Sequence, residues 1–243
     1  MPVDILAFGP HPDDAEIGAG ATLLKLKRLG YRTGIVDLTT GDMGMGTPAI
    51  RAEESRRAAK ILQLDVRENL DLGDWRVTDS FENQCRAAAM IRKHRPQIVL
   101  APWYDLPITR GLGHNDHYKG GQIVANAFNL AHLRKPPIEG EPFQAKAIFF
   151  YFLPSGTQPT FVVDVSDTIE EAIAAVECHQ SQFNNPERPR PADAPTVLDR
   201  MRSNAHYWGW NVGAHYGQAF LANVPLRVTD MIELVRDAAP RPV

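Results

Sequence analysis

The chain of 243 residues contains 44% hydrophobic and 23% charged residues, the composition of a soluble globular protein whose core needs no disulfide. Its formal net charge is −3, so charge gives no reason to expect a nucleic acid or an anionic membrane as a partner. The two cysteines, Cys85 and Cys178, have no CxxC spacing and are interpreted as thiols without a role.

Apolar runs of strand length alternate with amphipathic stretches of helical length through the first two thirds of the chain. Strands are predicted at residues 3–8, 33–39, 67–70, 98–102, 145–153 and 161–165, and helices at residues 16–29, 48–64, 80–94 and 116–132. This alternation is typical of a parallel sheet with helices on both faces, and continuous apolar strands agree with burial on both sides. The predicted fold is α/β, a Rossmann-like three-layer sandwich with a mostly parallel central sheet.

The last third of the chain changes character. Helices are predicted at residues 167–178 and 196–212, with a proline-rich loop at 184–195 between them and a last strand at 218–223. No internal repeat or low-complexity tract divides the chain, so residues 1–243 are predicted to form one domain.

The most informative segment follows the first predicted strand. His11, Asp13 and Asp14 come directly after the apolar run at residues 3–8 and just before a predicted helix. Polar groups concentrated at a strand end suit a metal site or an acid–base site better than a core. The plainer alternative is that the two aspartates cap the helix.

A second polar cluster, with His114, Asp116 and His117, opens the helix after the fourth predicted strand. In an open α/β sheet, ligands bind outside the carboxyl ends of the strands where the strand order reverses, and strands one and four are commonly neighbours there. Histidines three apart on a helix share a face. Topology therefore predicts that this cluster lies close to His11. The alternative is that His114 and His117 are simply exposed to solvent at the beginning of the helix.

A His/Asp/His set with an open position suits zinc. Catalytic zinc has three protein ligands and a water molecule, whose pKa falls to about 7 when bound. A spare carboxylate can accept the proton of that water, and a spare protonated histidine can stabilise an oxyanion and later protonate a leaving amine. Together the two clusters supply three ligands, one spare aspartate and one spare histidine.

The two clusters resemble the signatures of the LmbE-like, or PIG-L, family of N-deacetylases. The first family motif, HPDD(A/E)-x-x-G, is similar to His11-Pro12-Asp13-Asp14-Ala15-Glu16-Ile17-Gly18. The second, His-Pro-Asp-His, is similar to His114-Asn115-Asp116-His117, in which Asn115 replaces the proline. Further similar stretches are Thr39-Thr40-Gly41-Asp42, Arg51-x-x-Glu54-x-x-x-Ala58-Ala59-x-x-Leu62 and Tyr216-Gly217-Gln218-Ala219-Phe220. The resemblance spans nearly the whole chain and implies a single LmbE-like domain that is a zinc-dependent N-deacetylase.

The resemblance implies a role for each residue of the two clusters. His11, Asp14 and His117 would bind Zn²⁺. Asp13 would be the general base, and His114 would be the charged electrophile and later the proton donor.

It also implies roles around the metal. Asp116 would hold a ring nitrogen of a histidine, as metal sites commonly require. The planar fork of Arg51 suits a substrate carboxylate. Arg110 and Tyr216 are further candidates for substrate binding. An exposed ion pair between Arg51 and Glu54 is the plainer alternative for that helix.

Within the family, the likeness is greatest to the deacetylases of bacillithiol biosynthesis, which act on N-acetylglucosaminyl-malate. It rests on Asp4-Ile5-Leu6-Ala7-Phe8-Gly9, Val162-Val163-Asp164-Val165-Ser166 and His179-Gln180-Ser181-Gln182-Phe183. The expected partner is therefore a small amino-sugar substrate, with the malate conjugate preferred and an inositol-linked or free amino sugar left open. The family also implies a homo-oligomer such as a hexamer.

Two non-catalytic alternatives stay open. Gly18-Ala19-Gly20 could belong to a dinucleotide-binding turn, but the third glycine of G-x-G-x-x-G would fall at Leu23. The second alternative is a protein that binds zinc but has no catalytic activity. The presence of Asp13 and His114, the residues with implied catalytic roles, argues against it. The N-terminus has no signal-type segment and no apolar run approaches the ~20 residues of a membrane span. We therefore expect a cytoplasmic protein, in a reducing compartment, with no membrane partner.

Overall fold

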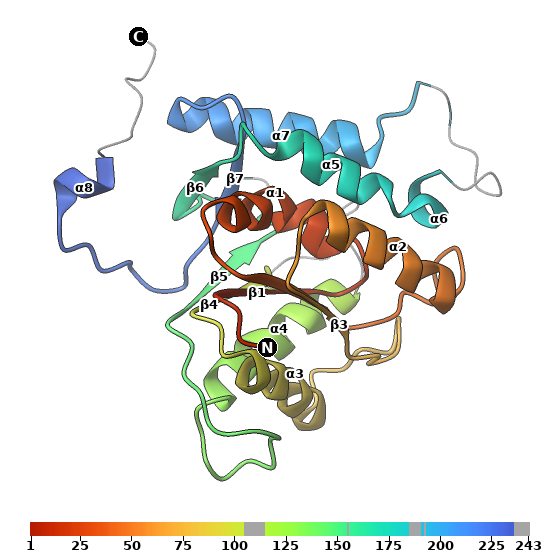
Figure 1. The fold of residues 1–243 in the computed structure, drawn as a ribbon, viewed down its shortest axis with the longest axis vertical. Coiled ribbons are helices and arrows are strands. Elements are labelled where there is room, and N and C mark those ends of the chain that lie inside the picture. Colours follow the sequence, from red (N-terminus) through yellow and green to blue (C-terminus); the bar gives the residue numbers. More distant parts are fainter. Residues whose placement is uncertain (105–114, 155, 185–190, 192, 236–243) are drawn as a thin grey trace.

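A five-stranded parallel sheet forms the centre of the molecule. The computed structural model describes residues 1–104, 115–154, 156–184, 191 and 193–235. The strands are β1 (Ile5–Gly9), β2 (Thr33–Asp37), β3 (Val66–Asn69), β4 (Ile98–Pro102) and β5 (Ala147–Tyr151), and they lie in the order β3-β2-β1-β4-β5 (Figure 1). The predicted α/β fold with a parallel central sheet is confirmed.

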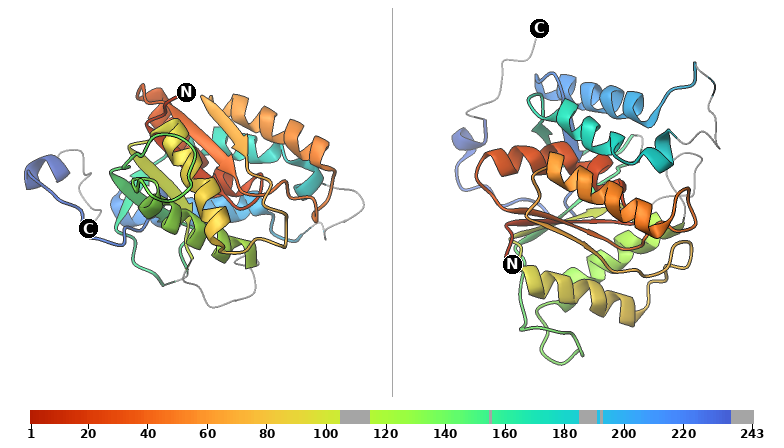
Figure 2. Two further views of the ribbon diagram at one scale, coloured as in Figure 1. Left: turned by 90° about the horizontal axis from the view of Figure 1, so that it is seen from below. Right: turned by 45° about the vertical axis from the view of Figure 1, so that its right-hand side comes forward.

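Helices cover both faces of this sheet. The described helices are α1 (Asp14–Arg28), α2 (Pro48–Ile61), α3 (Phe81–His94), α4 (Asn115–Leu130), α5 (Ile169–Glu177), α6 (Gln180–Phe183), α7 (Val197–Val212) and α8 (Met231–Val235). Helices α1 and α2 cover one face, and α3 and α4 cover the other (Figure 1, Figure 2). Helix α5 packs on α1 and α2, and α7 packs on α5, so an outer helical layer is added to the three predicted layers.

Each face of the sheet has its own apolar core. Along β1, Leu6 and Phe8 point into the core beneath α3 and α4, whereas Ile5 and Ala7 point into the core beneath α1 and α5. Because side chains alternate between the two faces of a strand, a strand covered on both sides is apolar at most of its positions. This explains why the predicted strands were continuous apolar runs.

The strand order reverses between β1 and β4. Strand β1 pairs in parallel with β2 on one side and with β4 on the other, with Ile5 opposite both Thr33 and Ile98. The predicted neighbourhood of strands one and four is confirmed. The loops that follow β1 and β4 therefore leave the same edge of the sheet at the position where ligands bind in such folds.

A separate antiparallel ribbon accounts for the last strand. Strands β6 (Phe161–Asp164) and β7 (Gly217–Phe220) pair with each other, and an isolated bridge from Leu221 to Phe150 links the ribbon to the main sheet. The predicted strand at residues 218–223 is therefore confirmed over Gln218–Phe220, although it begins one residue earlier, at Gly217, and is shorter at its end. The short helices α6 and α8 were not predicted, since neither contains enough residues to show a helical period.

None of the helices in the described part of the chain is long and apolar enough to cross a membrane. Both cysteines are free thiols, with Cys85 buried and Cys178 partly buried.

Candidate metal centre

The turn after β1 is fastened to the end of β2. The main-chain nitrogens of Leu38 and Thr39 donate to the carbonyls of Gly9 and Pro10, at 2.8 and 3.0 Å. Asp13 then occupies the N-cap position of α1, but its side chain makes no capping hydrogen bond. The capping alternative was therefore wrong for Asp13, whose carboxylate is left for other contacts.

Three side chains converge at this turn. The Nδ1 atom of His11 lies 2.9 Å from Oδ2 of Asp14, and the Nε2 atom of His117 lies 3.4 Å from the same oxygen. His117 comes from the first turn of α4, so the two polar clusters meet as topology predicted. One donor atom from each residue lies within 4.8 Å of the others, an arrangement that could hold a metal ion. Two imidazoles and one carboxylate are a donor set that zinc accepts in catalytic sites.

Two buried carboxylates face the other ring nitrogen of His11. Its Nε2 atom lies 3.3 Å from Oδ1 of Asp74 and 3.6 Å from Oδ2 of Asp116. The sequence predicted such a role for Asp116, but it gave no sign of Asp74, which lies in the loop after β3. Carboxylates in this position fix the orientation of a ligand histidine and make it more basic.

Charges around the cluster suit cation binding. Burial alone would lower the pKa of His11, but contacts with Asp116, Asp14 and Asp74 raise it to about 12. Burial would raise the pKa of Asp14, but His117 and His11 together hold it well below its usual range. Burial lowers the pKa of His117, which favours the neutral imidazole that a metal requires. A metal ion would therefore displace a proton mainly from His11.

Asp74→Asn should weaken metal binding about 10- to 100-fold, because a neutral amide replaces the nearer carboxylate facing His11. Affinity can be measured by competition with a chelating dye. Asp71→Asn is a matched control, since Asp71 is exposed, lies in the same loop, and has a backbone φ of 48° that asparagine also tolerates. Parental affinity in Asp74→Asn would exclude a role for Asp74 at the metal.

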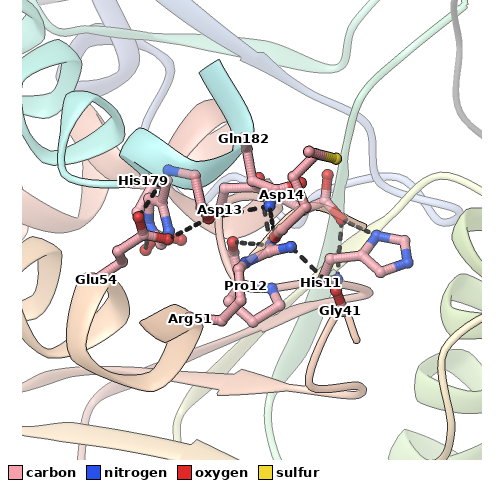
Figure 3. A network of polar contacts seen from close by, with 12 residues as sticks. His11, Pro12, Asp13, Asp14, Gly41, Arg51, Glu54, His179 and Gln182 are labelled. Carbon is pink, nitrogen blue, oxygen red and sulfur yellow. Dashed lines mark hydrogen bonds and ion pairs between the residues drawn. The ribbon is translucent and has the colours of Figure 1, made fainter. Parts of the chain in front are cut away.

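Arg51 is buried against the turn rather than exposed. Its NH2 group donates to the carbonyl of Pro12 at 2.7 Å and lies 3.5 Å from Oδ2 of Asp13, and its NH1 group donates to the carbonyl of Gly41 at 3.3 Å (Figure 3). Only 3% of Arg51 is accessible. Gly41 has a φ of +67°, and a side chain there would collide with this guanidinium.

Glu54 does not pair with Arg51. It is buried, and its carboxylate accepts hydrogen bonds from the main-chain nitrogen and the hydroxyl of Ser181, both at 2.7 Å. The alternative of an exposed ion pair between Arg51 and Glu54 was therefore wrong. The helical spacing suggested a surface pair because it does not reveal that α6 covers this part of α2.

Three other residues that were predicted to belong to the site are not found among the converging side chains that the structure describes. His114 and Arg110 lie outside the described residues. Tyr216 is partly buried, bonds through its main chain to Ser166, and packs its ring beside His206. It is not among the residues that line the cavity described next.

A cavity of about 660 Å³ opens beside the converging side chains. Asp14 and His117 form part of its wall, which continues along residues 152–154 and 156–158 to α7, where Tyr207 and Trp208 line it. This volume lies within the range of sites that bind small molecules. Aromatic side chains with a polar edge suit a ligand that is partly apolar and partly hydroxylated.

The glycines of the dinucleotide alternative are inside a helix. Gly18 and Gly20 lie in α1, and a side chain at Gly18 would lie 2.1 Å from the ring of Tyr151. The hydroxyl of Tyr151 donates to the carbonyl of Phe8 at 2.6 Å. Gly18 is thus needed for packing between α1 and β5, and no phosphate-binding turn is formed there.

Comparison with known proteins gives consistent matches. The family model described as PIG-L, GlcNAc-PI de-N-acetylase, matches residues 6–128. The diacetylchitobiose deacetylase of Thermococcus kodakarensis is 33% identical over 88% of this chain and 80% of its own length.

Solved structures agree. The conserved protein TT1542 from Thermus thermophilus superimposes with a TM-score of 0.83 and 36% identity, covering 94% of this chain and 98% of the other. The N,N'-diacetylchitobiose deacetylase from Pyrococcus horikoshii, solved with an inhibitor, gives a TM-score of 0.76 and 26% identity, covering 95% and 88%.

Proposed function

Because this chain belongs to the PIG-L, or LmbE-like, family of de-N-acetylases, we propose that it is a metal-dependent hydrolase that removes the acetyl group from an N-acetylglucosaminide. One observation supports this most directly. His11, Asp14 and His117 converge beside Asp13 at the wall of a cavity of small-molecule size. The homo-oligomer and the cytoplasmic location expected from the sequence stay predictions.

The metal that we propose is zinc. His11, Asp14 and His117 would hold it, and Asp74 and Asp116 would steady His11 from behind. When bound, a zinc ion supplies Lewis acidity, which polarises the acetamide carbonyl and makes a water molecule easier to deprotonate.

Asp13 is the residue that we propose as the general base. Burial and the neighbouring charge of Asp14 raise its pKa to about 7, although Arg51 and His179 act in the opposite direction. A general base works best when its pKa is near the working pH. A large fraction of it is then unprotonated, and it is still basic enough to accept a proton readily. His114 keeps the role that the sequence suggests, which is to stabilise the developing oxyanion and then protonate the leaving amine.

The aglycone of the substrate has two candidates. The sequence favours the malate conjugate, for which Arg51 was expected to clamp the carboxylate. In the structure, both terminal amino groups of Arg51 donate to main-chain carbonyls, and only 3% of the residue is accessible, which disfavours a clamp on a substrate carboxylate. A disaccharide is the second candidate, supported by the cavity wall with Tyr207 and Trp208 and by the similarity to a diacetylchitobiose deacetylase.

The proposed function is tested by measuring acetate release with zinc present. The substrate panel contains N-acetylglucosamine and its malate, inositol and N-acetylglucosamine conjugates. We expect release from at least one conjugate, and its loss after the metal is removed with a chelator. No release from any member, by protein shown to contain zinc, would contradict the proposal.

Arg51→Ala separates the two roles considered for Arg51. Because Arg51 holds the turn that carries Asp13, we expect kcat to fall by about 10- to 100-fold for every substrate that is turned over. A carboxylate clamp would instead raise KM for the malate conjugate alone. Arg56→Ala, on the exposed side of α2, is the control and should change neither constant.

A further inference from the structure

One aromatic side chain lies between the candidate metal ligands and the rest of the cavity. Phe152 is the first residue after β5, and it lines the cavity together with Asp14 and His117. Its ring is stacked on the imidazole of His117, with 5.8 Å between the ring centroids and 20° between the planes. A molecule that enters the cavity and reaches these two ligands therefore lies close to this ring.

The backbone of Phe152 is strained. Its φ is 58°, in the left-handed region that a bulky side chain rarely adopts. Such strain costs free energy, persists only where the surroundings impose it, and is concentrated at sites of function. The fold thus maintains the position of this ring at a cost, although Phe152 is neither a metal ligand nor a group that can transfer a proton.

The ring of Phe152 is also held in place. The ring of Tyr151 meets it edge-on, at a centroid distance of 4.8 Å and an interplanar angle of 72°. Tyr151 is fully buried, and its carbonyl accepts a hydrogen bond from the main-chain nitrogen of Trp103 at 2.8 Å. Because His117 and Tyr151 pack against it from two directions, Phe152 has little room to rotate. It forms a rigid part of the cavity wall.

The cavity wall next to this ring is apolar. Ile17 and Gly18 follow Asp14 by three and four residues in α1, so they share its face of the helix and line the cavity beside it. Gly18 has no side chain, and the ring of Tyr151 fills the space that a Cβ atom there would need. We call Phe152, Ile17 and Gly18 the apolar end of the cavity, because they adjoin the candidate metal ligands.

Toward α7 the wall is mixed, and polar side chains appear in it. They include Thr157, Gln158, Ser203 and Asn204. Hydroxyl and amide groups can both donate and accept hydrogen bonds, as the hydroxyls of a sugar require. The cavity therefore differs in chemistry between its apolar end, beside the metal ligands, and its part next to α7.

An N-acetylated sugar has the same asymmetry. Its hydrolysis adds water to the amide carbonyl, breaks the C–N bond, and releases the acyl group as a carboxylate and the sugar as an amine. The carbonyl carbon carries a small apolar methyl group on one side and the nitrogen of a large hydroxylated sugar on the other. With the carbonyl at the candidate metal centre, the methyl group matches the apolar end and the sugar matches the wall toward α7.

We propose that Phe152 is a specificity-determining residue, which contacts the acyl group of the substrate and restricts hydrolysis to the acetyl group. The inference rests on the proposed function, because it requires an amide carbonyl at the candidate metal centre. It extends that function by naming the side chain that measures the length of the acyl chain. It also gives a reason for the strained backbone of Phe152.

The test compares N-acetyl, N-propionyl and N-butyryl forms of the conjugate that the parent hydrolyses fastest in the panel above. Phe152→Gly removes the ring, and glycine adopts a φ of 58° without strain, so the fold should persist. One methylene group in an apolar pocket changes kcat/KM by about 10- to 200-fold. We expect the parent to prefer acetyl over propionyl by at least about 10-fold, and Phe152→Gly to reduce this preference by about 10-fold or more.

The ratio of kcat/KM for two acyl groups does not depend on the fraction of protein that holds zinc, and zinc content is measured on the same preparations. Phe152→Leu, which keeps an apolar side chain on the same backbone, should give a ratio between those of the parent and the glycine variant. Phe81→Gly is the matched control, because Phe81 is exposed at the start of α3 and does not line this cavity. It should leave the ratio unchanged.

Three results would overturn the proposal. The first is a parent that hydrolyses the three acyl forms equally well. The second is the parental ratio in both Phe152 variants. The third is a KM that rises equally for all three acyl forms in Phe152→Gly, which would place the sugar rather than the acyl group against this ring. Absence of release from every acyl form by the zinc-loaded parent would instead count against the proposed function.

Discussion

Asp13→Asn should bind zinc with parental affinity and lose turnover, with kcat lowered about 100- to 10,000-fold, the usual contribution of a general base. Asparagine has the shape of aspartate and tolerates an unusual φ, so the strained turn should persist while the proton acceptor is removed. Zinc content and kcat, measured on the same preparation, check the two halves of this expectation. Turnover close to that of the parent would remove Asp13 from the role of base.

The same variant should be at least as stable as the parent when metal is absent. Burial and the charge of Asp14 raise the pKa of Asp13 from its ordinary value of 3.8 to about 7 in the folded protein. The folded state therefore binds more protons than the unfolded state between these values, and the parent loses stability as the pH rises through that window. Asp13→Asn lacks this dependence, so its advantage in unfolding free energy should grow from pH 4 to pH 7. A constant difference across the window would contradict the raised pKa.

His117→Ala should lose most of its bound zinc and, with it, nearly all acetate release. His117 is the donor that α4 brings to the cluster, and removal of a donor should weaken binding more than the roughly 10- to 100-fold seen for residues that only support a ligand. Zinc retained after dialysis, measured by atomic absorption, is the direct readout.

His132→Ala serves as the control for that experiment, because it removes an exposed histidine shortly after the same helix. Unchanged zinc content in His117→Ala would show that the metal is not bound where the three donors converge. Loss of zinc with full retention of activity would show that the hydrolysis does not need it.

Much of the architecture could be predicted because its physical signals are local. Apolar runs such as residues 33–39 and the amphipathic stretch at 48–64 mark strands and helices within short windows. The meeting of His11 with His117 could also be predicted, since it requires only that strands one and four are neighbours. The roles of these residues in binding zinc and in catalysis stay predictions.

What the sequence did not reveal depends on contacts between distant segments. Asp74 lies in a loop with no motif, and it faces His11 only because β3 and α3 place that loop at the carboxyl edge of the sheet. The burial of Arg51 follows from the approach of Gly41 and of the turn at Pro12, which helical spacing on α2 cannot show. The bond between Glu16 and His179 joins two segments that are 163 residues apart in the sequence.

The convergence of His11, Asp14 and His117 also has a consequence for the order of folding. The first two residues belong to the turn after β1, and the third to a helix that follows β4, so no local stretch of chain can present all three donors. High-affinity zinc uptake should therefore begin only after β4 has docked beside β1, a late step for a parallel sheet with distant pairings. A metal ion that binds only the native chain stabilises the folded state and does not guide the early collapse of the chain. The rate at which zinc is bound during refolding should therefore report the rate at which the central sheet is completed.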